Sequence, residues 1–264
     1  MPRLAANLSW LFQEYGYLAR FEAARRVGFR GVECLFPYDT PAEETALALQ
    51  DARLAMALIN TPAGDWQKGE RGFAGVPGRE FEFHAGFDQA FDYACRIGCT
   101  RIHLMAGLVP EGVALEACEA VFVENLREAA DRLARHGMSA TIEPLNSIDV
   151  PGYMLSGSRQ ARRLIEAVGR ANLKLQWDAY HLQIMEGNLA VSFERDRDII
   201  GHVQIAGVPG RNEPDSGEIN YWFLLARMDA LGYQGTVGCE YRPRSGTLAG
   251  LGWARSYGIR PEAR

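Results

Sequence analysis

Four oxygen-bearing side chains follow or end short apolar runs in the second half of the sequence. Glu143 ends the run ATIE, Asp178 ends LQWD and Glu240 ends VGCE. Gln204 lies within HVQIA. If these runs are neighbouring strands, three carboxylates face one cavity, where they repel unless their pKa values rise or a cation neutralises them. Three carboxylates and an amide form an all-oxygen ligand set that suits Mg²⁺ or Mn²⁺.

Polar residues also stand at the ends of the earlier apolar runs. They are Asn7, Glu33, Asn60 and His103. A single polar residue at a strand end is as often a solvated or capping side chain as a functional one, so the prediction rests on several strands each supplying one. His202 shares a strand face with Gln204 if alternation is strict, and we interpret it as a structural residue deeper in the core.

Four further side chains are candidates for contact with a substrate. His181 follows Asp178 by three residues, where it can either hydrogen-bond a substrate oxygen or pack at a helix start. Arg211, Lys68 and Arg71 lie in loop-like segments, where a surface ion pair is the default role. The alternative is that one of these cations binds an anionic substrate, because Arg pairs with carboxylates in a bidentate manner.

The elements that must position these residues alternate regularly along the chain. Strand-like runs are predicted near residues 3–7, 31–36, 54–60, 101–106, 138–143, 172–178, 200–206 and 236–240. Helix-like stretches between them include residues 17–27, 79–97, 116–136, 158–168 and 219–231. Gly28, Gly98 and Gly137 follow three of these stretches and are good helix stops, because Gly accepts a positive φ.

This pattern predicts an α/β fold, a single (β/α)₈ TIM barrel that spans residues 1–264 as one domain. Eight strands in 264 residues fit one barrel better than a doubly wound sheet, and no glycine-rich phosphate fingerprint follows the first strand. Active sites of such barrels lie where strands end. The long segments 61–78 and 207–218 are therefore predicted to be binding loops.

Composition limits the class of protein further. The 28 basic and 33 acidic residues give a net charge of −5, which argues against a nucleic-acid surface. The five cysteines are odd in number and lack a disulfide framework, so we expect reduced thiols and a cytoplasmic location. A zinc pair at Cys95 and Cys99 is the weaker interpretation, because no second pair follows. No secretory signal or membrane-length apolar run is visible.

Several longer motifs, in order along the chain, resemble the hydroxypyruvate isomerase family within the xylose-isomerase-like barrels. The motifs are AANLSWLF, GFRGVECLFPYD, NTPAGDWQKGERG, VPGRE, HVQIAGVPGRNEPDSGEINY and GCEYRP. The resemblance covers nearly the whole chain.

This resemblance implies roles for individual residues. It implies catalytic acid/base glutamates at Glu143 and Glu240, which with Asp178 and Gln204 also ligate a divalent metal. Related ketose epimerases have a histidine where this chain has Gln204, a departure that makes the ligand set all-oxygen and favours Mg²⁺ or Mn²⁺. The blocks WDAYH and GRNEP resemble substrate-contacting segments, which supports His181 and Arg211 as contacts.

The implied reaction is a metal-dependent aldose–ketose isomerisation of hydroxypyruvate and tartronate semialdehyde, by proton transfer through an enediolate. The alternative is a 2-oxo-tetronate isomerase that acts on a four-carbon 2-oxo acid. A non-catalytic sugar-acid binding protein and a DNA endonuclease are the rival classes. Neither a nucleic-acid nor a membrane partner is expected, and a homo-oligomer is conceivable because related barrels often pair.

Overall fold

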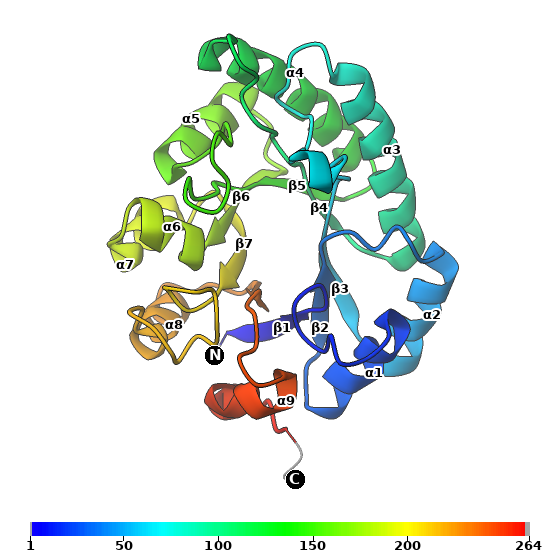
Figure 1. The fold of residues 1–264 in the computed structure, drawn as a ribbon, viewed down its shortest axis with the longest axis vertical. Helices are drawn as coiled ribbons and strands as arrows, with labels where there is room; N and C mark the ends of the chain where they lie inside the picture. Colours follow the sequence, from blue (N-terminus) through cyan, green and yellow to red (C-terminus); the bar gives the residue numbers. More distant parts are fainter. Residues whose placement is uncertain (1, 262–264) are drawn as a thin grey trace.

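The chain forms a closed parallel β-barrel with helices outside it (Figure 1), seen in a computed structural model that describes residues 2–261. Each strand pairs with the next along the chain, and β8 pairs with β1 to close the ring. The strands are β1 (Arg3–Asn7), β2 (Gly31–Cys34), β3 (Ala55–Asn60), β4 (Arg101–His103), β5 (Ser139–Ile142), β6 (Leu173–Asp178), β7 (Ile200–Ile205) and β8 (Thr236–Cys239). The predicted (β/α)₈ fold is confirmed.

Helices connect successive strands around the outside of the barrel (Figure 1). The α-helices are α1 (Tyr17–Arg26), α2 (Ala42–Ala52), α3 (Glu80–Ile97), α4 (Leu115–Ala134), α5 (Ser158–Val168), α6 (Ala179–Met185), α7 (Leu189–Asp196), α8 (Tyr221–Ala230) and α9 (Thr247–Gly250). Two 3₁₀ segments accompany them, η1 (Trp66–Lys68) and η2 (Leu251–Tyr257). No helix within residues 2–261 has the length and apolarity needed to cross a membrane.

The buried face of each helix packs on the barrel because apolar residues recur at helical spacing. In α3, for example, Phe83, Phe87, Ala90 and Ala94 are buried, and acidic Glu80 and Glu82 occupy its first turn, where the helix dipole favours negative charge. Gly98 ends this helix with φ of 67°, as predicted for a helix stop. Most strand residues are buried, as expected for a parallel sheet covered by helices.

Strand register brings the candidate residues to one rim of the barrel. Asn7 pairs with Glu33 across β1 and β2, and Asn60 pairs with His103 across β3 and β4. Asp178 pairs with Gln204 across β6 and β7. Because all strands are parallel, their carboxyl ends meet at the same edge, where TIM-barrel enzymes place their active sites.

Candidate active site

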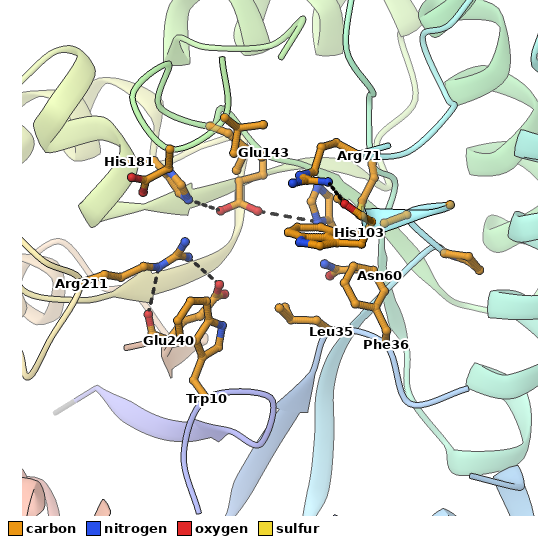
Figure 2. A pocket seen from close by; sticks show the side chains of 18 of the residues that line it. Trp10, Leu35, Phe36, Asn60, Arg71, His103, Glu143, His181, Arg211 and Glu240 are labelled. Atoms are coloured by element: carbon orange, nitrogen blue, oxygen red, sulfur yellow. Dashed lines mark hydrogen bonds and ion pairs between the residues drawn. The ribbon is translucent and has the colours of Figure 1, made fainter. Parts of the chain in front are cut away.

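A cavity of about 810 Å³ opens at the carboxyl ends of the strands (Figure 2). Its lining combines aromatic side chains with a few polar ones, the composition typical of a small-molecule site. Six of the polar residues are Asn60, Arg71, His103, Glu143, His181 and Arg211. Glu240 also lines the cavity. Asp178 and Gln204 are not among the lining residues and are almost fully buried.

Glu143 and Glu240 approach the cavity from β5 and β8, directly after the last residue of each strand. Both side chains are buried, and Figure 2 shows them on facing sides of the same space. Burial raises the pKa of Glu143 well above its usual value, and repulsion from Asp178 and Glu240 adds to the effect. Burial likewise raises the pKa of Glu240 to about 8, although the nearby Arg211 opposes the shift.

Arg211 is the cation that compensates this acidic cluster. Its guanidinium donates to Glu240 Oε1 at 2.5 Å and to Asp178 Oδ2 at 3.4 Å. Burial disfavours its charge, but Glu240, Asp178 and Glu143 outweigh burial, so the pKa of Arg211 is raised. Arg211 has a left-handed backbone with φ of 53°, an uncommon conformation for a non-glycine residue that tends to occur at functional sites.

Two buried carboxylates, with a histidine beside them, form a cluster that can hold a metal ion. Glu143, Asp178 and His181 offer ligand atoms that all lie within 4.8 Å of one another. Glu143 Oε1 is buried and has no hydrogen-bond partner, so it lacks the compensation that a buried carboxylate oxygen needs. A cation beside Glu143 Oε1 and Asp178 would supply that compensation, and therefore the residues fit a divalent metal.

His181 differs from the carboxylates in this cluster because its hydrogen bonds define its tautomer. The backbone N–H of Asn146 donates to His181 Nδ1 at 3.0 Å, so Nδ1 is an acceptor. Burial, reinforced by the charge of Arg211, lowers the pKa of His181 well below its usual value. The neutral ring therefore carries its proton on Nε2, which lies 3.7 Å from Asp178 Oδ2 and 4.0 Å from Glu143 Oε1. His181 thus presents an N–H donor to the site.

Gln204 takes part in a buried hydrogen-bond network below the glutamates. Its Nε2 donates to Glu240 Oε2 and, at 2.9 Å, to Glu33 Oε1. Its Oε1 accepts from Gln176 Nε2 at 2.6 Å, and Gln176 Nε2 also donates to Glu143 Oε2 at 2.9 Å. His202 Nε2 contacts Glu33 Oε2 at 2.6 Å in the same interior, which agrees with its interpretation as a deep structural residue.

The structure separates the two cations predicted in the loop 61–78. Arg71 lines the cavity. Lys68 does not, because η1 directs its side chain outward, where it is 81% exposed and pairs with Asp65 at 3.1 Å. Lys68 therefore lies outside the cavity at which we predicted a substrate contact.

Several cavity residues, and one residue that supports the site, were not predicted from the sequence. Trp10 and Arg242 line the cavity, and Gln176 supports it from below. The available signal for Gln176 was its position two residues before Asp178, which places both on one strand face. The Cys95 and Cys99 zinc pair has no support among the described residues, because Cys99 is buried while Cys95 is exposed.

Comparison with known proteins agrees with this geometry. Residues 21–257 match the family model of the xylose isomerase-like TIM barrel. A 2-oxo-tetronate isomerase from Cupriavidus necator is 51% identical over 97% of this chain and 99% of its own length. The hydroxypyruvate isomerase of Escherichia coli is 49% identical over 97% of this chain and its own full length.

A solved structure shows the same fold. A Brucella melitensis protein described as an AP endonuclease of family 2 is 47% identical, with a TM-score of 0.95 over 97% of this chain and 99% of its own. Three findings point to the same family: the strand-end glutamates, the closed barrel and the nearly full-length similarity to isomerases. The chain belongs to the hydroxypyruvate isomerase and 2-oxo-tetronate isomerase group of the xylose isomerase-like TIM barrels, and it is an isomerase.

Proposed function

We propose that this protein isomerises a short 2-oxo acid by moving a proton between adjacent carbons, with hydroxypyruvate and tartronate semialdehyde as the reacting pair. The observation that carries the proposal is the placement of Glu143 and Glu240. Both carboxyl groups are buried, lie at one cavity and come from separate strands, so one can remove a proton while the other delivers one.

Each glutamate has a defined set of partners that orients it for this task. Glu143 accepts from Gln176. Glu240 accepts from Gln204 and Arg211. In the proposed reaction, one glutamate takes the proton from the hydroxymethyl carbon, which leaves an enediolate, and the other protonates the former carbonyl carbon. The hydroxyl proton passes from the terminal oxygen to the former carbonyl oxygen, which completes the aldehyde and the new hydroxyl group. The His181 Nε2–H is suited to donate to a substrate oxygen, as developing negative charge requires.

We assign the metal ligands to Glu143, Asp178, Gln204 and Glu240, and the cation to Mg²⁺ or Mn²⁺. The unpartnered Glu143 Oε1 and its closeness to an Asp178 oxygen support the first two ligands, whereas Gln204 and Glu240 are assigned from the family resemblance. When bound, the cation supplies Lewis-acid polarisation of the substrate's carbonyl and hydroxyl oxygens. The protein's role is to hold both glutamates and to keep the cavity partly closed to water.

The experiment is a proton-exchange assay on purified protein. In D₂O, NMR should show deuterium entering the hydroxymethyl group of hydroxypyruvate as tartronate semialdehyde accumulates. Chelation should stop both events, and Mg²⁺ or Mn²⁺ should restore them. Glu240→Gln should lower kcat by about 100-fold or more, whereas Glu128→Gln on the surface should not. Full turnover by Glu240→Gln, or by metal-free protein, would refute the mechanism.

A four-carbon 2-oxo acid is the second candidate substrate. The cavity of about 810 Å³ has more room than a three-carbon acid fills, and one curated relative bears the name 2-oxo-tetronate isomerase. Comparison of kcat/KM for the two acids decides between them. A sugar-acid binding protein without catalysis would instead show thermal stabilisation by the acids and no deuterium uptake.

We do not propose a DNA substrate, although one solved relative is described as an endonuclease. The net charge is −5 and the cavity's centre is acidic, which opposes a phosphate backbone. A mobility-shift assay with abasic duplex DNA should show no binding. The five free thiols support our placement of the reaction in the reducing cytoplasm.

A further inference from the structure

One partly buried arginine at the cavity has no acidic partner among the described residues. Among the described residues that line the cavity, the cationic side chains are Arg71, Arg211 and Arg242. Arg211 already pairs with Glu240 and Asp178. Arg71 donates only to neutral main-chain oxygens, those of Trp66 at 3.1 Å and Glu70 at 2.7 Å. A half-buried guanidinium with spare donors and no counter-charge is well suited to an anionic ligand.

The position of Arg71 is set by a contact with an aromatic ring and by main-chain hydrogen bonds of the residues that follow it. Its guanidinium carbon lies 3.5 Å from the centroid of the Trp66 ring, a stacking geometry that fixes the plane of the group. The loop after it is attached to the segment that follows β4. The N–H of Ala74 donates to Met105 O at 3.2 Å, and Gly75 donates to Ala106 O at 2.7 Å. Arg71 therefore sits over the carboxyl end of β4.

His103 ends β4 and lines the same cavity as Arg71 (Figure 2). Its side chain is 1% exposed, yet neither ring nitrogen has a hydrogen-bond partner. A buried imidazole in a polar cavity without partners is costly unless a ligand supplies them. Its neutral ring has one N–H donor, which adds to the donors of Arg71.

We propose that Arg71 and His103 form the subsite that binds the carboxylate of the substrate. The inference rests on the proposed function and adds the direction in which the acid lies in the cavity. Figure 2 shows Arg71 and Arg211 on opposite sides, with Glu143 between them. The carboxylate therefore points toward β4 and the loop 61–78, and the reacting carbons lie toward the glutamates. Arg242 is the alternative cation for binding the carboxylate. Its side chain is exposed, however, and lies over Trp10, 5.7 Å from the centroid of that ring.

The test compares two three-carbon substrates that differ at one group. Hydroxypyruvate carries the carboxylate, and dihydroxyacetone carries a neutral hydroxymethyl group in its place. Wild-type protein should prefer the acid, as judged by kcat/KM. Arg71→Met should reduce this preference about 10- to 100-fold, the effect of losing a charge-assisted hydrogen bond. Arg71→Lys should restore part of it, and His103→Leu should reduce it by a smaller factor.

Two variants are matched controls, since each removes a cation from the same region. Lys68→Gln lies three residues away on the outer side of the loop, and Arg242→Gln lies at the same cavity, over Trp10. Both should keep the wild-type preference. An unchanged preference in Arg71→Met, or its collapse in Arg242→Gln, would overturn the proposal.

A binding measurement separates this inference from the proposed reaction. Calorimetric titration with tartronate, a non-reacting three-carbon dicarboxylate, should show binding to the wild type and weaker binding to Arg71→Met. If the wild type isomerises neither substrate, the proposed function fails, and the tartronate titration still decides on the subsite. Equal tartronate affinity in both proteins would then refute the carboxylate assignment.

Discussion

At the scale of single residues, the site depends on polar side chains spaced two apart along the inner strands. Strand alternation places both members of each pair on the barrel interior, one near the rim and one a layer below. The rim members are the candidate ligands; of the lower members, Gln176 donates to Glu143 and Gln204, Thr141 donates to Gln176, and His202 contacts Glu33. The pairs are Thr141 with Glu143, Gln176 with Asp178, and His202 with Gln204.

Gln176 should act as a positioning residue for Glu143 directly and for Glu240 through Gln204. It is fully buried, donates to Glu143 and Gln204, and accepts from Thr141 Oγ1 at 3.0 Å. Gln176→Met should therefore lower kcat and weaken Mg²⁺ or Mn²⁺ binding by calorimetry, because neither Glu143 nor Gln204 keeps its orientation. The loss of stability should be about 1–3 kcal/mol in urea unfolding.

Thr141→Val is the control for this prediction. It removes the hydroxyl that donates to Gln176 but leaves both donor contacts of Gln176 in place. Its metal affinity should remain close to that of the wild type, even if some stability is lost. Equal metal affinity in Gln176→Met and wild type would show that Gln176 only fills space.

Glu240 should make the stability of metal-free protein depend on pH. Burial, with repulsion from Asp178 and Glu33, raises the folded-state pKa of Glu240 to about 8, against about 4.3 for an unfolded chain. The folded state then binds the Glu240 proton more tightly than the unfolded chain does. This proton binding contributes fully to the free energy of unfolding below about pH 4.3, and the contribution is lost as pH rises through about 8. The unfolding free energy, relative to Glu240→Gln, should fall from pH 5 to pH 8.5.

Urea unfolding after chelator treatment measures this dependence. Saturating Mg²⁺ should offset the fall, because a cation binds the ionised carboxylates and so stabilises the folded state at high pH. A difference between wild type and Glu240→Gln that stays constant with pH would contradict the raised pKa.

At the scale of elements, the strands were predictable and several connections were not. Each of the eight predicted strands occurs, with ends shifted by no more than three residues, because buried parallel strands read as compact apolar runs. Helix α2 was not named, since its run AEETALALQDA mixes alanines with acidic residues. The short helices α6 and α7 follow Asp178 closely and have too few turns for a clear period.

The candidate site was predictable at the strand ends and less so in the loops. Glu143, Asp178 and Glu240 follow from strand positions alone. Lys68 and Arg71 are three residues apart in one loop, and no periodicity tells which of them faces the cavity. That outcome depends on η1, whose Asp65 cap accepts from two backbone N–H groups, and on the attachment of the loop to β4. The Asp65 cap is local, but the attachment is a tertiary contact that no local pattern reveals.

Gly72 should be essential to this attachment of the loop 61–78. Its φ is +100°, and an added Cβ would overlap the backbone carbonyl of Met105. Gly72→Ala should therefore displace the loop and raise KM for the acid substrate, in addition to the cost of a left-handed alanine, about 1–2 kcal/mol. Steady-state kinetics and urea unfolding measure the two effects separately.

Gly69→Ala is the matched control within the same loop. Its φ is +89°, so it carries the same backbone cost, but nothing lies within 4 Å of the added Cβ. KM should stay close to the wild-type value in Gly69→Ala. An equal change of KM in both variants would mean that backbone strain, and not contact with Met105, controls the loop.

At the scale of the whole molecule, closure of the barrel makes the first and last strands neighbours, and buried polar contacts link strands across the barrel interior. Strand β1 pairs with β8 along four residues, so the first and last strands are neighbours. Glu33 on β2 joins three strands at the centre, because it accepts from Asn7 on β1 and contacts His202 and Gln204 on β7. A chain closed in this way should unfold as one unit, as expected for the single domain we propose over residues 1–264.

Glu33→Leu should destabilise the entire barrel in one step. The substitution leaves buried donors from Asn7, His202 and Gln204 without an acceptor, so the loss should be about 3–5 kcal/mol. Circular dichroism and tryptophan fluorescence in urea should give coincident transitions, both shifted to lower denaturant. Glu128→Gln is the control, because Glu128 is 70% exposed and faces only His84 at 3.7 Å, so the change should stay within about 0.5 kcal/mol. Transitions that separate by probe would indicate two folding units, and a loss as small as that of the control would mean that the Glu33 cluster does not stabilise the closed barrel.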